Sequence, residues 1–226
     1  MPEFSISKWW SSANPFASPS TPIQATFPFL KGQVITVLPG HGGEDSGATA
    51  GSFKEKDFTL AAALALKKEL ELYGATVYLS REKDEKVSKI TQAEFANQKN
   101  SHVVIAIHFD SYIRDKSVSG TRIYYHRTAD ALLAKAINTA ILQVFPNRKG
   151  RIEVGDFHVL QKTTAPTLLV EWGYLSNNQD RLTMTAPHFN QKLARAITGG
   201  IHHYLKTNSQ GTFNTSAEME NMRKIK

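Results

Sequence analysis

Short apolar segments alternate along this chain with longer amphipathic segments. Residues 34–38 (VITVL), 103–107 (VVIAI) and 167–171 (TLLVE) are almost uniformly apolar, which is typical of strands buried on both faces. Residues 75–80 and 120–125 add two further predicted strands. Because the strands alternate with helical segments, we predict an α/β fold with a mostly parallel, twisted sheet of about six strands and helices on both faces.

Four amphipathic segments predict the helices that cover this sheet. They are residues 55–73, 90–99, 132–145 and 187–204. In three of them (55–73, 132–145 and 187–204) the apolar residues fall on one side at helical spacing, as expected for a helix that packs against a core. Gly74 follows the first segment, where a glycine commonly ends a helix.

The pattern predicts one folded domain with a tail at each end. A chain of 226 residues, 41% of them hydrophobic, is long enough to bury a full core. Residues 1–32 are rich in Ser and Pro and lack any helical or strand period, so we predict a flexible N-terminal segment. The folded domain is expected at residues 33–206 and a polar C-terminal tail at residues 207–226. No run approaches the ~20 apolar residues that a membrane span requires.

The amino-acid composition limits which residues can bind a metal and which partners the chain favours. The chain has no cysteine, so any metal must be held by His, Asp or Glu. Its formal net charge of +7 favours polyanionic partners, among them nucleic acid, anionic lipid and the acidic polymers of a bacterial envelope. Because no motif interleaves basic and aromatic residues, we do not expect nucleic-acid binding.

Four polar side chains stand where an α/β sheet collects its ligands. His41 follows the first strand in PGHGGEDSGA, His108 closes the third in VVIAIHFDS, and Glu171 closes the strand in PTLLVEWGYLSN. Glu55 opens the helix that follows the glycine-rich loop. Since the carboxyl ends of parallel strands meet at one edge, these side chains are expected to converge there.

Two imidazoles and one carboxylate suit a hydrolytic zinc site with a fourth position open, and a second carboxylate suits a general base. Each residue also has a simpler interpretation. His108 is explained as a hydrogen-bonded core residue, Glu55 as a first-turn acid favoured by the helix dipole, and the GHGG loop as an anion site. Glu171 is harder to explain in that way, because an unpaired carboxylate after an apolar run costs several kcal/mol.

In these residues and the segments around them, the chain resembles the catalytic domain of the zinc-dependent N-acetylmuramoyl-L-alanine amidases, the Amidase_3 family. The resemblance covers residues 34–205, and the segments that carry it are PGHGGEDSGA, EKDFTLAAALALKKELELYGATVYLSRE, IAIHFDS and PTLLVEWGYLSN. It implies that His41, Glu55 and His108 bind one Zn²⁺ per chain and that Glu171 is the catalytic carboxylate.

Three positions depart from the family's usual pattern. Gln92 stands where an Arg is common, Asp110 stands where an Asn is common, and residues 160–161 read Leu-Gln in place of Leu-Arg. None of these removes a ligand, so they bear on the choice of stem peptide or cross-link. Cell-division members carry an extra helix between the second His and the catalytic Glu that blocks the zinc. The segments assigned above nearly fill this interval, so no blocking helix is expected.

The resemblance implies a peptidoglycan hydrolase that cleaves the amide bond between N-acetylmuramic acid and L-alanine by zinc-activated water. The alternatives are a zinc peptidase or deacetylase acting on another amide, and an inactive wall-binding protein. The expected partner is peptidoglycan, and the expected oligomeric state is a monomer. Residues 1–22 lack the pattern of a signal peptide. We therefore expect either extracytoplasmic action after removal of an export signal, or release at lysis as with phage lysins.

Overall fold

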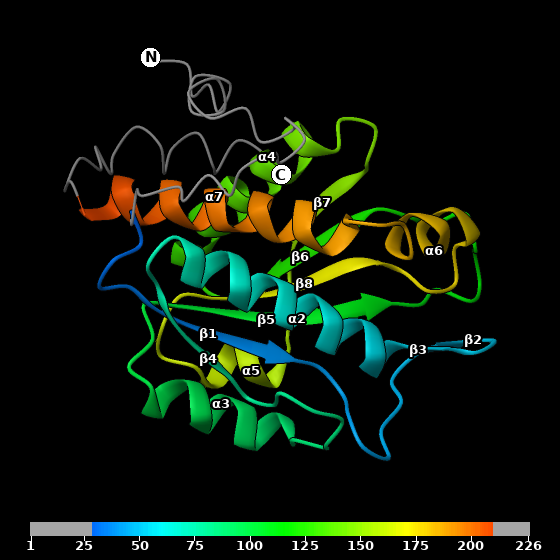
Figure 1. Cartoon of the computed structure of the whole chain (residues 1–226), viewed down its shortest axis with the longest axis horizontal. Helices are drawn as coiled ribbons and strands as arrows, with labels where there is room; N and C mark the ends of the chain where they lie inside the picture. Colours follow the sequence, from blue (N-terminus) through cyan, green and yellow to red (C-terminus); the bar gives the residue numbers. More distant parts are fainter. Residues whose placement is uncertain (1–28, 210–226) are drawn as a thin grey trace, which may run out of the picture.

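Six strands form one sheet in the computed structural model of the chain, which describes residues 29–209 (Figure 1). Their order across the sheet is β4-β1-β5-β8-β6-β7. The first four strands in this order run parallel, and β6 pairs antiparallel with β8 and parallel with β7. The strand bounds are Val34–Pro39 (β1), Thr76–Leu79 (β4), Val103–Asp110 (β5), Thr121–Tyr125 (β6), Gly150–Val154 (β7) and Thr167–Tyr174 (β8).

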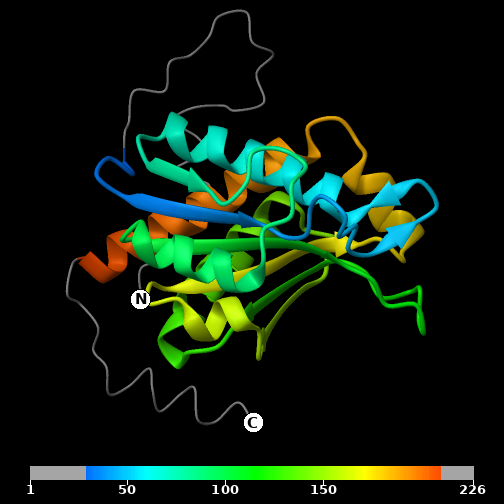
Figure 2. The same ribbon diagram turned by 90° about the horizontal axis from the view of Figure 1, so that it is seen from below.

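Helices cover both faces of this sheet. One face carries α2 (Glu55–Leu72), α4 (Ala131–Val144) and α7 (Phe189–Ser209), of which α7 packs against both of the others. The opposite face carries α3 (Lys89–Gln98) and α5 (His158–Lys162), which pack together and lie in front of the sheet in Figure 2. The remaining elements are the hairpin β2 (Thr49–Ala50) and β3 (Phe53–Lys54), the 3-10 helix η1 (Thr128–Asp130) and α6 (Asn178–Met184).

The strands divide their side chains between two apolar cores. Ile35 and Val37 of β1 belong to the core under α2, α4 and α7, whereas Leu38 belongs to the core under α3 and α5. In β8, Leu168 belongs to the first of these cores and Leu169 to the second. Because successive strand residues point to opposite faces, a strand that is buried on both faces is apolar at most of its positions.

The predicted fold class is confirmed, and its sheet has six strands. The β2–β3 hairpin, β7, α5 and α6 were not predicted. The strands of the hairpin have two residues each, and β7 (GRIEV) is a partly exposed edge strand, so neither has an apolar pattern. The interval between β5 and β8 does hold the short helix α5, but it packs on α3 and β8.

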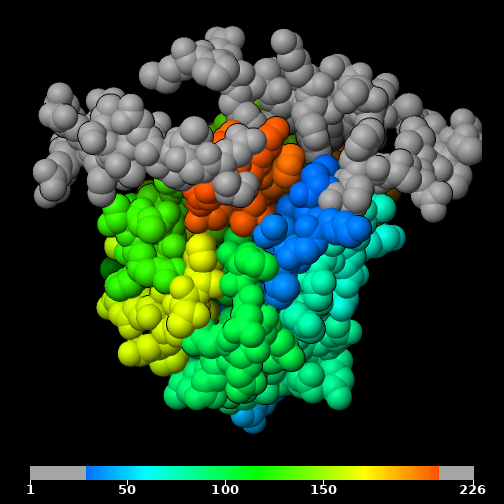
Figure 3. Space-filling view, turned by 90° about the vertical axis from the view of Figure 1, so that its left-hand side faces the viewer, coloured from blue at the N-terminus to red at the C-terminus, as the bar shows by residue number. Residues whose placement is uncertain are grey.

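The chain ends of the described region lie away from the carboxyl ends of the parallel strands. Figure 3 shows this opposite end, formed by the start of the described chain in blue, the end of α7 in orange-red and α3 in green. Leu30, within the predicted N-terminal segment, is fully buried, and α7 continues to Ser209. The rest of both predicted tails lies outside the described residues. Within residues 29–209, no helix combines the length and apolar character needed to cross a bilayer.

Candidate metal centre and active site

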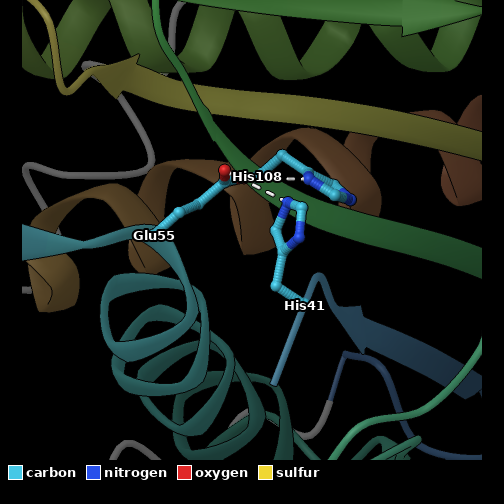
Figure 4. A group of neighbouring side chains, drawn as sticks. All are labelled: His41, Glu55 and His108. Carbon is cyan, nitrogen blue, oxygen red and sulfur yellow. Dashed lines mark hydrogen bonds and ion pairs between the residues drawn. The ribbon is translucent and has the colours of Figure 1, made fainter. Parts of the chain in front are cut away.

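Three side chains from separate parts of the chain meet at the carboxyl edge of the sheet. His41 lies in the loop after β1, Glu55 is the first residue of α2, and His108 lies in β5. One potential ligand atom from each lies within 4.8 Å of the other two, so the group can hold a metal ion. Figure 4 shows the three side chains pointing toward one another.

The Glu55 carboxylate lies between the two imidazoles. Its Oε2 is 3.1 Å from His41 Nε2, and its Oε1 is 3.0 Å from His108 Nδ1. The carboxylate also accepts the backbone N–H groups of Ala48 at 2.8 Å and Phe109 at 3.0 Å. Burial raises the pKa of Glu55, but the hydrogen bonds with His108 and His41 outweigh burial and hold the pKa well below its ordinary value. Glu55 is therefore a buried carboxylate in its charged form.

Asp45 orients the first imidazole. Its Oδ2 lies 3.0 Å from His41 Nδ1, which leaves Nε2 facing Glu55. Burial lowers the pKa of His41, but its contacts with Glu55 and Asp45 outweigh burial and raise the pKa above the ordinary value. A carboxylate on the outer nitrogen is a common companion of metal-binding histidines, because it fixes the tautomer and the ring orientation.

The backbone around the site depends on two glycines. A Cβ on Gly40 would lie 2.3 Å from Cε1 of His108, so only glycine lets the loop pass this ring. Gly47 has φ +63°, and a Cβ there would lie 2.6 Å from both Glu55 Oε2 and His41 Cδ2. The glycine-rich segment thus allows the backbone to approach the three side chains closely.

Glu171 lies next to this group, in the neighbouring strand. In the parallel pairing of β5 and β8 it stands directly opposite His108. Its side chain is buried, and its Oε2 has no hydrogen-bond partner among the described residues. Burial, and after it the negative charges of Asp110 and Glu55, raise the pKa of Glu171 well above its ordinary value, with a smaller opposing effect of Arg122. Such a carboxyl group holds a proton to a higher pH than an ordinary glutamate does, which is a common property of groups that transfer protons.

Arg122 flanks Glu171 on its other side, at the paired position of β6. Its guanidinium donates to the Tyr124 hydroxyl at 2.7 Å and lies 3.7 Å from Oδ2 of Asp110. The position of Arg122 could not be predicted from the sequence, because it depends on the pairing of β6 with β8, a strand that is distant in the chain.

Arg81 is a second residue that sequence reasoning missed. It is almost fully buried and donates to the carbonyl oxygens of Gly40 at 2.9 Å and Lys56 at 3.0 Å, and to the Thr59 hydroxyl at 2.9 Å. It therefore joins the His41 loop to the first turns of α2. A polar residue after a buried strand was the signal used for His108 and Glu171, and the same signal applies to Arg81.

Gln92, one of the departures from the family pattern, supports the same loop. Its buried side chain donates from Nε2 to the Pro39 carbonyl at 3.0 Å. Gln92 thus links α3 to the end of β1. All four site residues predicted from the sequence lie at this one edge of the sheet, with His41, Glu55 and His108 in mutual reach and Glu171 beside them.

Comparisons with known proteins show what this chain is similar to. Residues 35–203 match the family Amidase_3, described as N-acetylmuramoyl-L-alanine amidase. The probable cell wall amidase LytH of Staphylococcus epidermidis is 33% identical over 183 residues, which are 79% of this chain and 60% of the relative. The chain therefore spans about 60% of the length of this curated relative.

Two solved structures are similar over most of their length. The catalytic domain of CwlV, an N-acetylmuramoyl-L-alanine amidase from Bacillus (Paenibacillus) polymyxa var. colistinus, has 31% identity and a TM-score of 0.72, covering 77% of this chain and 98% of that one. The amidase AmiC2 of Nostoc punctiforme has 31% identity and a TM-score of 0.74, covering 77% of this chain and 97% of that one.

Proposed function

Because the chain belongs to the N-acetylmuramoyl-L-alanine amidase family, we propose that it hydrolyses the amide bond between N-acetylmuramic acid and L-alanine in peptidoglycan. The observation that carries the proposal is the group of His41, Glu55 and His108 within 4.8 Å of one another, beside a buried carboxyl group in the next strand. This arrangement fits metal-assisted hydrolysis of an amide, in which an ion polarises the carbonyl group and a nearby residue moves a proton.

The residues at the site fit a zinc ion. Two imidazole nitrogens and one carboxylate oxygen match the ligands of hydrolytic zinc sites, and the chain has no cysteine to offer in their place. His41 is already held by Asp45 through its outer nitrogen. We assign one zinc ion per chain to His41, Glu55 and His108. When bound, zinc supplies Lewis-acid chemistry, which polarises a carbonyl group and makes water more acidic.

Glu171 is assigned the proton transfers. Its raised pKa suits a carboxyl group that takes a proton from the attacking water and later returns it to the departing amine of L-alanine. His41, Glu55 and His108 position the reacting groups, and the low pKa of Glu55 keeps this carboxylate available as a ligand. The products are a muramic acid with a free carboxylate and a peptide with a free L-alanine amine.

The proposed substrate sets the place of action. Peptidoglycan lies outside the cytoplasmic membrane, so the enzyme acts in the periplasm or cell wall, or reaches the wall at lysis as a phage lysin does. The cell wall amidases among the relatives support this extracytoplasmic site of action. We expect a monomer, because all four site residues come from one chain.

Mass spectrometry of digested peptidoglycan tests the proposed reaction. Zinc-loaded protein is expected to release intact stem peptides that begin with a free L-alanine. Glu171→Gln is the control, and its rate is expected to fall by a factor on the order of 10² or more, as for loss of an acid–base catalyst. Stem peptides cut internally would indicate a zinc peptidase and loss of acetyl groups a deacetylase, and either result would replace the proposal. Near-normal turnover by Glu171→Gln would remove Glu171 from its role.

A further inference from the structure

A cleft of about 810 Å³ opens at the same end of the sheet as the site. Its walls are the β2–β3 hairpin, the loop after β5 and the turn that leads from β8 into α6. Figures 1 and 2 both place these three segments together at this end of the molecule. Each wall is continuous with a site residue, since the hairpin runs into Glu55 and the other two walls follow His108 and Glu171 within a few residues. The volume is that of a typical ligand pocket.

Two hydrogen bonds hold the loop after β5 against the turn after β8. The Tyr112 N–H donates to Ser176 Oγ at 2.9 Å, and Asn177 Nδ2 donates to the Lys116 carbonyl at 2.8 Å. The Asn177 side chain also accepts the Asp180 N–H at 2.9 Å, so it caps α6 and anchors the loop together. The backbone of Lys116 is therefore fixed at the wall of the cleft.

The charges that line the cleft are all positive. Lys116 and Arg181 are among the lining residues, and no Asp or Glu is. Among the residues that the structure describes, neither cation pairs with a carboxylate, because Lys116 has no ion-pair partner and Arg181 donates to the Leu175 carbonyl and the Asn178 side chain. A concave surface with two uncompensated cations attracts an anionic ligand.

Asp180 does not pair with these cations, because its carboxylate is engaged elsewhere. It accepts the N–H groups of Gly120 and Tyr174 at 2.9 Å each and lies 3.6 Å from the guanidinium of Arg148. The other lining residues are neutral, and Ser52, Asn178 and Gln179 are among the polar ones. They supply donors and acceptors of the kind that a peptide backbone needs.

We propose that this cleft binds the stem peptide of the substrate, with Lys116 and Arg181 recognising its free carboxylates. The inference rests on the proposed amidase function. In that substrate the lactyl carboxyl of muramic acid is tied up in the amide bond, so the free carboxylates lie on the peptide side. A positive cleft beside the metal centre therefore fits the peptide and not the glycan. The enzyme then prefers stem peptides with free carboxylates over amidated ones.

Two synthetic muramyl tripeptides test this preference, one with free carboxylates and one with every carboxylate converted to an amide. Wild-type protein is expected to show the larger kcat/KM on the acid form. Lys116→Gln is expected to lose about two- to fivefold of kcat/KM on that form, through KM, which is the range for one exposed ion pair. Its loss on the amide form is expected to match that of Lys135→Gln, an exposed lysine of α4 that does not line the cleft.

The salt dependence of the preference and a second variant provide two further tests. The preference of the wild type is expected to shrink as salt is raised, because exposed charges are screened. Arg181→Gln is expected to act like Lys116→Gln, but it also removes the bond to Leu175. Its melting temperature must therefore be measured. The Lys116→Gln result stands alone, because this side chain is exposed and supports no other described residue.

The outcomes separate this inference from the proposed function. If wild type cleaves both forms equally, or if Lys116→Gln changes both forms equally, the cleft does not read carboxylates and the inference fails while the amidase function stands. If no muramyl peptide is cleaved, the amidase function fails. In that case, calorimetric titration of the free tripeptide, in acid and amide forms, into Glu171→Gln protein shows whether the cleft binds the peptide through its carboxylates. Binding that requires both the carboxylates and Lys116 supports the inference, and equal or absent binding overturns it.

Discussion

Glu55 depends on its neighbours for its charged state. The two imidazoles and two backbone N–H groups that surround it replace the water that a buried carboxylate loses. Glu171 lacks such partners, although it lies in the adjoining strand region. The pKa values of the two carboxyl groups are therefore shifted in opposite directions, which suits Glu55 to its proposed role as a metal ligand and Glu171 to the proposed proton transfers.

Gly47 provides a test of how closely the loop packs on the ligands. Gly47→Ala places a methyl group 2.6 Å from Glu55 Oε2 and His41 Cδ2, so zinc affinity is expected to fall by about tenfold or more. Gly51→Ala is the matched control. Its φ of +62° gives a similar backbone cost of about 1 kcal/mol, but nothing lies within 4 Å of its Cβ. Competition with a zinc chelator measures both affinities, and equal losses in the two variants would contradict the geometry.

The raised pKa of Glu171 predicts a pH-dependent cost in stability. Below its ordinary pKa of 4.5 the carboxyl group is protonated in folded and unfolded chains alike, so no cost arises. As pH rises above that value the unfolded chain ionises first, and stability is lost until the pH passes the folded pKa. Metal-free Glu171→Gln is therefore expected to be more stable than wild type at pH 7, by an amount on the order of 1 kcal/mol.

Urea unfolding of both metal-free proteins between pH 4 and pH 8 measures this difference. The gain of Glu171→Gln is expected to shrink toward pH 4. A gain that does not vary with pH, or a loss at neutral pH, would show that the buried carboxyl group carries no such penalty.

At the scale of elements, the site depends on how α2 is attached to the loop after β1. Arg81 makes this attachment from the end of β4, because one guanidinium reaches the Gly40 carbonyl in the loop and the Lys56 carbonyl in the helix. His41 and Glu55 stand next to these two residues in the chain. Arg81 thus sets the separation of His41 and Glu55, although neither of them is among its hydrogen-bond partners.

Arg81→Lys tests this attachment, because lysine keeps the charge but lacks the planar fork that spans both segments. Stability is expected to fall by about 2–4 kcal/mol, since several buried carbonyl groups lose their donor. Zinc affinity is expected to weaken as well. Arg114→Lys, at an exposed position in the loop after β5, is the control. If both variants unfold at the same urea concentration, Arg81 does not hold the two elements together.

At the scale of the whole molecule, the sequence predicted where the four proposed site residues lie, but not which residues surround them. His41, His108 and Glu171 were found because polar residues that follow or end buried strands in a parallel sheet share one edge, a rule that needs no coordinates. Arg122 and the cleft around Lys116 were not found. Their places depend on the antiparallel pairing of β6 with β8 and on loops that meet only in three dimensions.

We propose that the folded chain brings His41, Glu55 and His108 to one zinc ion. The most direct measurement is the zinc content per chain by elemental analysis after dialysis, for the wild type, for the three single alanine variants and for Glu171→Gln. We expect about one zinc ion in the wild type and in Glu171→Gln, and a large loss in each of the three alanine variants. Retention of zinc by the alanine variants, or a wild type that cleaves peptidoglycan without any bound metal, would contradict it.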